Sequence, residues 1–180
     1  MQFRFVPVAI ILIVATVTSC KQVGGGSLAP GNKAPDLDFV TFDNEPAKLS
    51  DFRGKVVLLH FLASWCAPCI EEVPALNALH QQMEGEDFVL LAIGTEDNLD
   101  DLQSFVSDNG VRFPVYFDKS NLVRHRYKVT GFPESFLLDK AGNLVLMVDP
   151  HNNNPTIRLT GPQNWGSPAM KQALKKLLKE

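Results

Sequence analysis

The chain has 180 residues and a formal net charge of -3 at pH 7, and 45% of its residues are hydrophobic against 21% that are charged. This length predicts one domain, and the composition is ordinary for a globular protein with a single core. The small negative charge argues against nucleic acid as a partner, because nucleic-acid binding needs a basic surface. The three cysteines are too few for a scaffold stapled by disulfides, so we expect individual roles for them.

The first twenty residues are predicted to be a signal sequence outside the fold. A short, positively charged start at residues 1–4 precedes an almost wholly apolar run over residues 5–17. This run is about 13 residues long, whereas a helix that spans a bilayer needs roughly 20. Its layout is that of a secretory signal, so we expect the domain that follows to be exported.

Cys20 is the candidate site of membrane attachment. The segment Val17-Thr18-Ser19-Cys20 resembles a bacterial lipoprotein signal, in which the cysteine is lipidated and becomes the new N-terminus. Acyl chains on Cys20 would anchor the protein in a membrane. The alternative is an incidental cysteine near a cleavage site or in an uncleaved anchor. Residues 21–32 are rich in glycine and predict a flexible tether, so the domains are residues 1–20, 21–32 and 33–180.

Apolar patterns in residues 33–180 predict alternating strands and helices. Strands are expected over residues 34–42, 56–62, 88–93 and 113–117 and in a hairpin of 134–138 with 144–148, and helices over 66–83, 99–109, 122–127 and 169–178. The continuous apolar runs predict strands buried on both faces, and Pro74 is expected to kink the first helix. This order predicts an α/β fold with a central mixed β-sheet flanked by helices on both faces.

Cys66 and Cys69 carry the predicted chemistry. The motif Cys66-Ala67-Pro68-Cys69 follows a buried strand and opens a helix, which is the context of a redox-active C-x-x-C. At the helix N-terminus, unpaired N–H groups and the helix dipole stabilise a thiolate on Cys66. We therefore expect Cys66 to be the nucleophile and Cys69 to resolve the mixed disulfide.

A zinc site and a purely structural disulfide are the alternative, non-catalytic interpretations of this pair. Zinc usually takes four ligands, but there is no second cysteine pair, and the four histidines, at positions 60, 80, 125 and 151, lack metal-ligand spacing. A structural disulfide here would close a very small loop and constrain little. The prediction is a redox pair that uses neither a metal nor another cofactor.

The sequence around these cysteines resembles the TlpA/ResA-like branch of the thioredoxin-like family, whose members are exported and membrane-tethered. The matching segments are Ala34-Pro35-Asp36, residues 49–58, residues 65–74, residues 130–139 and residues 161–165. The resemblance implies a thioredoxin-like fold and an enzyme that reduces disulfides of exported proteins, such as apocytochrome c. It also implies a membrane electron donor as partner, and we expect a monomer that faces the periplasm or the cell exterior.

The same resemblance implies roles for residues around the cysteine pair. Pro133 is expected to follow a cis peptide bond, which for X–Pro lies only about 0.5–1 kcal/mol above trans; the alternative is an ordinary trans turn. The backbone of Phe132 would then pair with an extended substrate. Trp65 and Pro68 are expected to contact the substrate as well, with packing alone as the other interpretation of Trp65.

Glu72 and His60 are the candidates for proton handling. Glu72 lies three residues after Cys69 and so on the same helix face, where the family has a glutamate linked to proton transfer. A buried carboxyl there would have a raised pKa and could accept the proton of Cys69, whereas the alternative is a solvated residue. His60 departs from thioredoxin, which has a buried aspartate at the matching place. It is either a proton relay or a hydrogen-bonded core residue.

Two functions of other classes remain open. Peroxiredoxins share the Ala-Pro-Asp and Leu-Ser-Asp lead-in, but they have a threonine where this chain has Ala63, and they lack the C-x-x-C. A non-catalytic thiol- or metal-binding lipoprotein is the other alternative. The direction of the reaction is open too, because potentials in this fold class span about −270 to −120 mV. The stretch 151–155 is a loop that either shapes partner choice or merely connects two strands.

Overall fold

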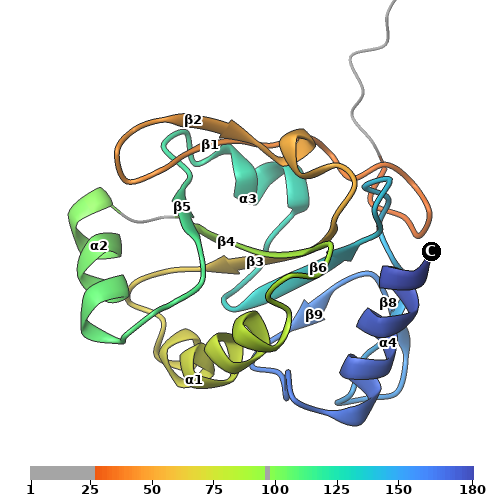
Figure 1. The fold of residues 1–180 in the computed structure, drawn as a ribbon. Coiled ribbons are helices and arrows are strands. Elements are labelled where there is room, and N and C mark those ends of the chain that lie inside the picture. The colour runs from red at the N-terminus through yellow and green to blue at the C-terminus, as the bar shows by residue number, and fades with distance from the viewer. Residues whose placement is uncertain (1–26, 96–97) are drawn as a thin grey trace, which may run out of the picture.

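The computed structural model describes residues 27–95 and 98–180. The predicted signal sequence, Cys20 and the first part of the tether lie outside these residues. The described chain forms a seven-stranded sheet in the order β2-β1-β5-β4-β3-β6-β9 and a separate two-stranded ribbon, β7-β8 (Figure 1).

The sequence predicted most of these elements to within a few residues. The strands are β1 (Asp38–Val40), β2 (Pro46–Lys48), β3 (Val56–Leu62), β4 (Phe88–Gly94), β5 (Val115–Phe117), β6 (Glu134–Leu138), β7 (Met147–Val148), β8 (Pro155–Thr156) and β9 (Leu159–Thr160). The helices are α1 (Ala67–Gln82), α2 (Leu99–Asp108), α3 (Leu122–Tyr127) and α4 (Pro168–Lys179), with a short 3-10 helix η1 at Leu49–Phe52.

Strand β3 lies inside the sheet, between β4 and β6, and is buried along its whole length. It runs parallel to β4 and antiparallel to β6, so the sheet is mixed as predicted. Successive side chains of a strand point to opposite faces. One core cluster contains Val56, Leu58 and Leu62 of β3, and the other contains Val57, Leu59 and Phe61. His60 has the parity of the first set and therefore faces the same side as Leu58 and Leu62.

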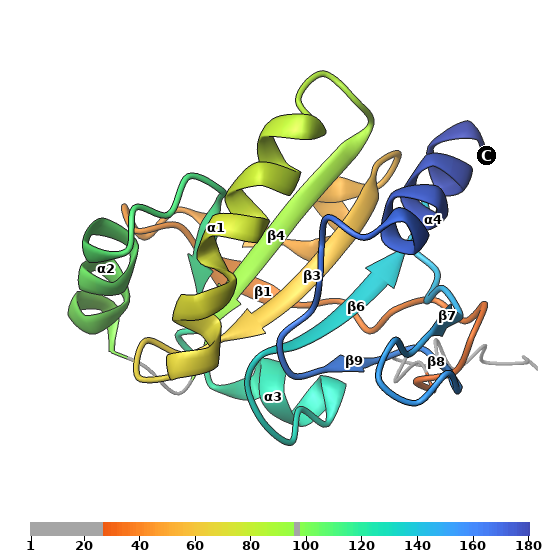
Figure 2. The same cartoon turned by 90° about the horizontal axis from the view of Figure 1, so that it is seen from below.

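Helices cover both faces of the sheet, which confirms the predicted architecture. The buried residues of α1, α2 and α4 belong to the same cluster as Leu58, and those of α3 belong to the cluster of Leu59. Figure 2 shows α1 lying across β3 and β4, with α4 beside it near β6. Helices exclude water from both faces of the sheet. Side chains on both faces of β3 can therefore be apolar, which accounts for the continuous apolar run in its sequence.

Helix α1 begins directly after Cys66, which is its N-cap, and ends before Met83. On α1 the apolar residues Val73, Leu76 and Leu79 are buried, but Ile70 is 39% exposed. Ile70 lies in the first turn, where the helix starts beyond the end of β3. Its exposure places an apolar side chain on the surface next to the cysteines.

The structure confirms the turn of the predicted hairpin, but the second strand is shorter than predicted. Leu138 and Leu144 form a β-bridge, and the Val145 N–H donates to the Leu137 carbonyl at 2.9 Å. Beyond Val145 the chain leaves the sheet, and β7 pairs with β8 instead. Strand β9 takes the place beside β6, because its Leu159 enters the core there.

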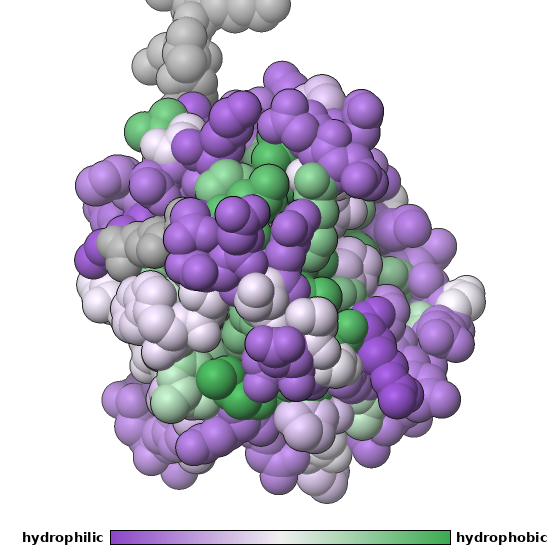
Figure 3. All heavy atoms as spheres, turned by 90° about the vertical axis from the view of Figure 1, so that its left-hand side faces the viewer, coloured by the Kyte–Doolittle hydropathy of each residue, from purple (hydrophilic) through white to green (hydrophobic). Residues whose placement is uncertain are grey.

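The face over α2 is mainly polar. In Figure 3 hydrophilic side chains dominate this face, and hydrophobic atoms show only in small areas between them. None of the helices in residues 27–95 and 98–180 combines the length and apolarity that a membrane crossing needs.

Candidate active site

The two cysteines form a disulfide where β3 gives way to α1. The Cys66–Cys69 sulfurs are 2.17 Å apart, and the Cα atoms are 5.3 Å apart. Both residues are buried, at 4% and 1% exposure, whereas Ala67 and Pro68 between them are exposed. The Cys69 backbone N–H donates to the Cys66 sulfur at 3.2 Å. The helix therefore begins with an N–H directed at the predicted nucleophile, a position that stabilises a thiolate.

An aromatic pair, made by the exposed Trp65 and the half-buried Phe132, lies next to the disulfide. Trp65 is 64% exposed, and its ring packs edge-on against Phe132 with the ring centroids 5.7 Å apart. Ile70 adds a third apolar side chain on the first turn of α1. The structure thus brings together Trp65 and Phe132, which the sequence predicted as substrate contacts, although they are far apart in the chain.

The peptide bond between Phe132 and Pro133 is cis, as the resemblance implied. Pro133 is buried, and its carbonyl accepts the Gly161 N–H at 2.9 Å. The contact between Trp65 and Phe132 places this turn beside the cysteine motif. Phe132, the residue before the cis proline, thus lies where it would contact a substrate that approaches the disulfide.

A buried ion pair supports this turn, and the sequence analysis missed it. Glu134 accepts the Thr130 N–H at 3.0 Å, and its other oxygen lies 2.7 Å from Arg158 Nε. Burial raises the pKa of Glu134, while its hydrogen bonds and the Arg158 charge act against that rise. A glutamate at the start of the mostly apolar segment 134–138 was the available signal, because a buried carboxyl nearly always has a partner.

Glu72 is buried, so the solvated alternative is excluded by its position. Its Oε1 accepts the Gln163 backbone N–H at 2.6 Å and the Trp165 Nε1–H at 2.8 Å. Burial raises the pKa of Glu72 to about 7, although these two hydrogen bonds act in the opposite direction. A carboxyl with this pKa exchanges protons readily near neutral pH. Glu71, its neighbour in the chain, is exposed.

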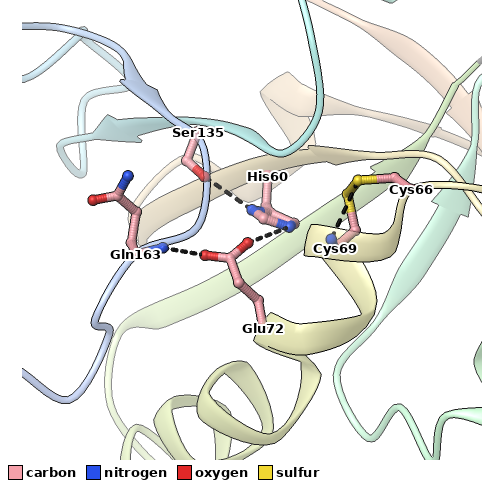
Figure 4. The surroundings of a disulfide bond; sticks show 6 residues. All are labelled: His60, Cys66, Cys69, Glu72, Ser135 and Gln163. Carbon is pink, nitrogen blue, oxygen red and sulfur yellow. Dashed lines mark hydrogen bonds and ion pairs between the residues drawn. A yellow bond between two sulfur atoms is a disulfide. The ribbon is translucent and has the colours of Figure 1, made fainter.

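His60 lies between Ser135 and Glu72 on the side of the disulfide (Figure 4). Its Nδ1 is 2.9 Å from Ser135 Oγ, and its Nε2 is 3.9 Å from Glu72 Oε2. The second distance is too long for a hydrogen bond. Complete burial lowers the pKa of His60 to about 4, so the imidazole is neutral over most of the pH range. The two side chains are therefore a neutral pair rather than a salt bridge between pH 4 and 7.

Potential metal ligands are scattered over the described part of the chain. Within residues 27–95 and 98–180, no three His, Cys, Asp or Glu side chains are grouped so that they could hold a metal ion. The site instead consists of a disulfide, an exposed apolar rim and buried groups that can bind a proton. This combination can exchange disulfides with an extended peptide.

Comparison with known proteins identifies thiol–disulfide oxidoreductases among the relatives of this chain. The sequence model of the AhpC/TSA family matches residues 30–147. The thiol-disulfide oxidoreductase ResA of Geobacillus kaustophilus is 32% identical over 118 residues, which cover 66% of this chain and 68% of that protein. ResA of Bacillus anthracis is 32% identical over 115 residues, which cover 64% of this chain and 66% of its relative, just under two thirds.

Solved structures show the same fold over a larger share of the chain. A crystal structure of a thiol:disulfide interchange protein described as DsbE from Chlorobium tepidum has a TM-score of 0.70 and 30% identity. The match covers 84% of this chain and 99% of that one. StoA from Bacillus subtilis matches with a TM-score of 0.58 and 21% identity over 82% of this chain and 98% of its own, which supports the fold alone.

Proposed function

The chain belongs to the AhpC/TSA family and has the fold and cysteine pair of a thioredoxin-like thiol–disulfide oxidoreductase, and on this premise we propose that it reduces disulfides of exported proteins. One observation carries the proposal. The Cys66–Cys69 disulfide lies at a helix N-terminus, beside a cis-proline turn and an aromatic pair of which the Trp65 ring is exposed. A redox pair placed next to an apolar docking surface suits a protein client.

The reaction begins with the reduced pair. The Cys66 thiolate attacks one sulfur of the client disulfide and forms a mixed disulfide, while the other client sulfur leaves as a thiolate and takes up a proton. Cys69 then loses its proton and attacks the Cys66 sulfur. This step forms the Cys66–Cys69 disulfide and releases the second client thiol. Two electrons pass to the client, and a dithiol donor must return them.

Glu72 is the proposed acceptor of the Cys69 proton. It lies one helical turn after Cys69 on the buried side of α1. Because burial raises its pKa to about 7, the carboxylate is basic enough to take a proton near neutral pH and to release it afterwards. The hydrogen bonds from Gln163 and Trp165 hold Oε1 in place and leave Oε2 for the proton.

The client is proposed to dock on Trp65, Phe132 and Pro68. Aromatic rings supply a large apolar contact area with few rotatable bonds, and the Phe132 backbone precedes the cis bond. Apocytochrome c, whose haem-binding cysteines must be reduced, is the leading client by resemblance to the ResA-like branch. The relatives' names, which state thiol–disulfide exchange, support the chemistry but do not identify the client.

We further propose that the protein acts outside the cytoplasm as a monomer, held to a membrane by lipid on Cys20. The signal-like residues 1–20 and the glycine-rich residues 21–32 support this placement. A membrane protein would then be the electron donor. An anchored reductase remains close to such a donor even in an oxidising compartment.

Peroxidase activity has weaker support, although the matched family model covers the Ala-Pro-Asp and Leu-Ser-Asp motifs that this chain shares with peroxiredoxins. Asp36 accepts hydrogen bonds from the Ser50 backbone N–H at 2.9 Å and from the Ser50 hydroxyl at 2.8 Å. The shared lead-in motifs thus hold two segments together and have a structural purpose of their own. Ala63, which stands where a peroxiredoxin has threonine, is buried and offers no hydroxyl.

Cysteine variants test the proposed roles. We expect Cys66→Ser and Cys69→Ser each to abolish turnover of a disulfide substrate. Only Cys69→Ser should accumulate a mixed disulfide with clients, because it keeps the nucleophile and lacks the resolving thiol. Non-reducing electrophoresis with mass spectrometry identifies the trapped partner. Trapping through the Cys66→Ser variant would reverse the assignment of the two thiols.

The direction of the reaction is tested by the reduction potential of the pair, measured by equilibration in dithiol buffers. A reductase should have a potential near that of thioredoxin, about −270 mV. A potential near −120 mV, the value of a strong disulfide donor, would contradict the proposed direction while leaving the exchange chemistry intact.

A further inference from the structure

Two polar atoms face each other in the core without a hydrogen bond. His60 Nε2 and Glu72 Oε2 are both buried, and neither has a hydrogen-bond partner among the described residues. They lie 3.9 Å apart, and Figure 4 shows them directed at one another. Buried polar groups are nearly always paired. This arrangement therefore points to a state of the site in which the two side chains approach to about 3 Å and share a proton in a hydrogen bond.

The surrounding hydrogen bonds decide which oxygen of Glu72 carries the proton. Oε1 accepts two N–H groups, from Gln163 and Trp165. A proton on Oε1 would compete with both donors, so a protonated Glu72 carries its proton on Oε2. That O–H is directed at His60 Nε2, which must then be the nitrogen without a proton.

Ser135 allows His60 to take either tautomer. A serine hydroxyl both donates and accepts hydrogen bonds, and Ser135 Oγ is 2.9 Å from Nδ1. With Glu72 protonated, Glu72 donates to Nε2 and Nδ1–H donates to Ser135. With Glu72 ionised, Nε2–H donates to the carboxylate and the Ser135 hydroxyl donates to Nδ1. The imidazole carries one proton in both arrangements, and the two states differ by the single proton on Glu72.

We propose that His60 is a positioning residue whose change of tautomer stabilises both protonation states of Glu72, with Ser135 as the hydroxyl that reverses its hydrogen bond. This inference rests on the proposed function in one respect, since the proton gained by Glu72 is the one that Cys69 gives up. Cys69 becomes the thiolate that attacks Cys66, and the histidine remains neutral. A histidine that titrated would instead place a second charge in the core.

The other charged groups near this pair are directed elsewhere. Glu134, next to Ser135 on β6, is paired with Arg158. His151 contacts the Gln163 side chain at 3.4 Å rather than Glu72, and Glu71 on α1 is exposed. The Trp165 indole packs edge-on against the His60 ring and carries no charge. The pKa of His60, lowered to about 4 by burial, agrees with an imidazole that stays neutral while Glu72 titrates.

The experiment measures the tautomer and the carboxyl separately in the oxidised protein. Nitrogen-15 NMR distinguishes Nδ1–H from Nε2–H, and carbon-13 NMR follows the Glu72 carboxyl with pH. In the wild-type protein we expect the proton of His60 to move from Nδ1 to Nε2 as Glu72 ionises. One tautomer at every pH would overturn the proposal.

Two variants should move the Glu72 pKa in opposite directions. His60→Met removes the hydrogen-bond partner of both forms of Glu72, and because the bond to the charged form is the stronger one, the pKa of Glu72 should rise by about one unit. Ser135→Ala leaves Nδ1 without a partner, which favours Nε2–H and should lower the pKa. His60→Gln, whose amide can donate or accept, is the matched control and should restore the wild-type value.

A purely structural role for His60 predicts a different pattern. All three variants would then change the unfolding temperature but leave the Glu72 pKa unaltered, and that result would overturn the proposal. Where His60→Met does not fold, Ser135→Ala and the wild-type tautomer decide the question. Reduction of a model disulfide is assayed in parallel. Its absence would overturn the proposed function, whereas the NMR result stands independently of it.

Discussion

Two ionisable residues in one core, His60 and Glu72, affect the pH dependence of stability in opposite directions. The pKa of His60 falls from 6.5 to about 4 on folding, so between these values the unfolded chain binds more protons and stability rises with pH. The pKa of Glu72 rises from 4.5 to about 7, so there the folded chain binds more protons and stability falls with pH. Between pH 4.5 and 6.5 the two effects largely cancel.

Glu72→Gln should remove the carboxyl contribution of this pair and leave that of His60. We expect the free energy of unfolding of this variant to rise as the pH increases from 4 to 6.5, by roughly 1.4 kcal/mol for each unit of the His60 pKa difference. It should then remain level up to pH 8, where the wild-type protein has lost stability. Denaturant unfolding of the oxidised proteins across this range measures the effect, with the exposed Glu71→Gln as control. A flat profile for Glu72→Gln below pH 6.5 would contradict the burial of a neutral histidine.

At the scale of elements, the meeting of β6 with β9 supports the cis-proline turn. Arg158 lies between β8 and β9, pairs with Glu134 and donates from Nη2 to the Tyr127 carbonyl at 2.9 Å. Its guanidinium also lies over the Phe136 ring, 5.4 Å from the centroid. One side chain thus connects the edge of the sheet to the end of α3, directly behind the turn.

Arg158→Met should destabilise the protein by about 3 kcal/mol at neutral pH, because it leaves the buried carboxylate of Glu134 without its cation. The loss should shrink at acidic pH, where Glu134 is protonated and needs no positive partner. Chemical unfolding at pH 4 and pH 7 tests both statements. Arg126→Met is a suitable control, since Arg126 donates to the Asp36 carbonyl at 2.6 Å but is exposed. Equal losses for the two variants would argue that the ion pair contributes little.

At the scale of the whole molecule, the described end of the tether, residues 27–32, and the disulfide lie at opposite ends of the central strands. The segment 31–34 is attached to the turn after β6. The Gly31 N–H donates to the Leu144 carbonyl at 2.8 Å, and the Ala34 N–H donates to the Gly142 carbonyl at 3.0 Å. The cysteines follow the other end of β3, beside Glu134 at the start of β6. An anchored domain would therefore direct its disulfide away from the point of attachment. A tether of about ten residues, at most roughly 35 Å long, leaves room for it to turn toward a donor.

Cys20→Ser tests the anchor. If Cys20 carries lipid, the variant should lose label from a fatty-acid precursor, while the purified domain keeps its activity toward a soluble disulfide. Fractionation of cells and metabolic labelling measure the two effects, and wild-type protein serves as the reference. Retention of label in the variant would show that another residue is lipidated.

The local elements and the redox motif could be predicted from the sequence because they depend on residues close together in the chain. The apolar run of β3, the helical spacing of α1 and the C-x-x-C at their junction are all local patterns. Even the face on which His60 lies follows from its parity with Leu58 and Leu62. The cis bond before Pro133 came from resemblance rather than from any local pattern.

Only the tertiary structure decided how distant segments meet. Gln163 and Trp165 lie 91 and 93 positions from Glu72, yet they hold its carboxylate. Likewise β9 rather than residues 146–148 borders β6, since the choice depends on which segment buries an apolar side chain there. Hydrophobic periodicity specifies the face that each element buries but not the partner it is buried against. The proton-binding group beside the disulfide is therefore a property of the packed molecule.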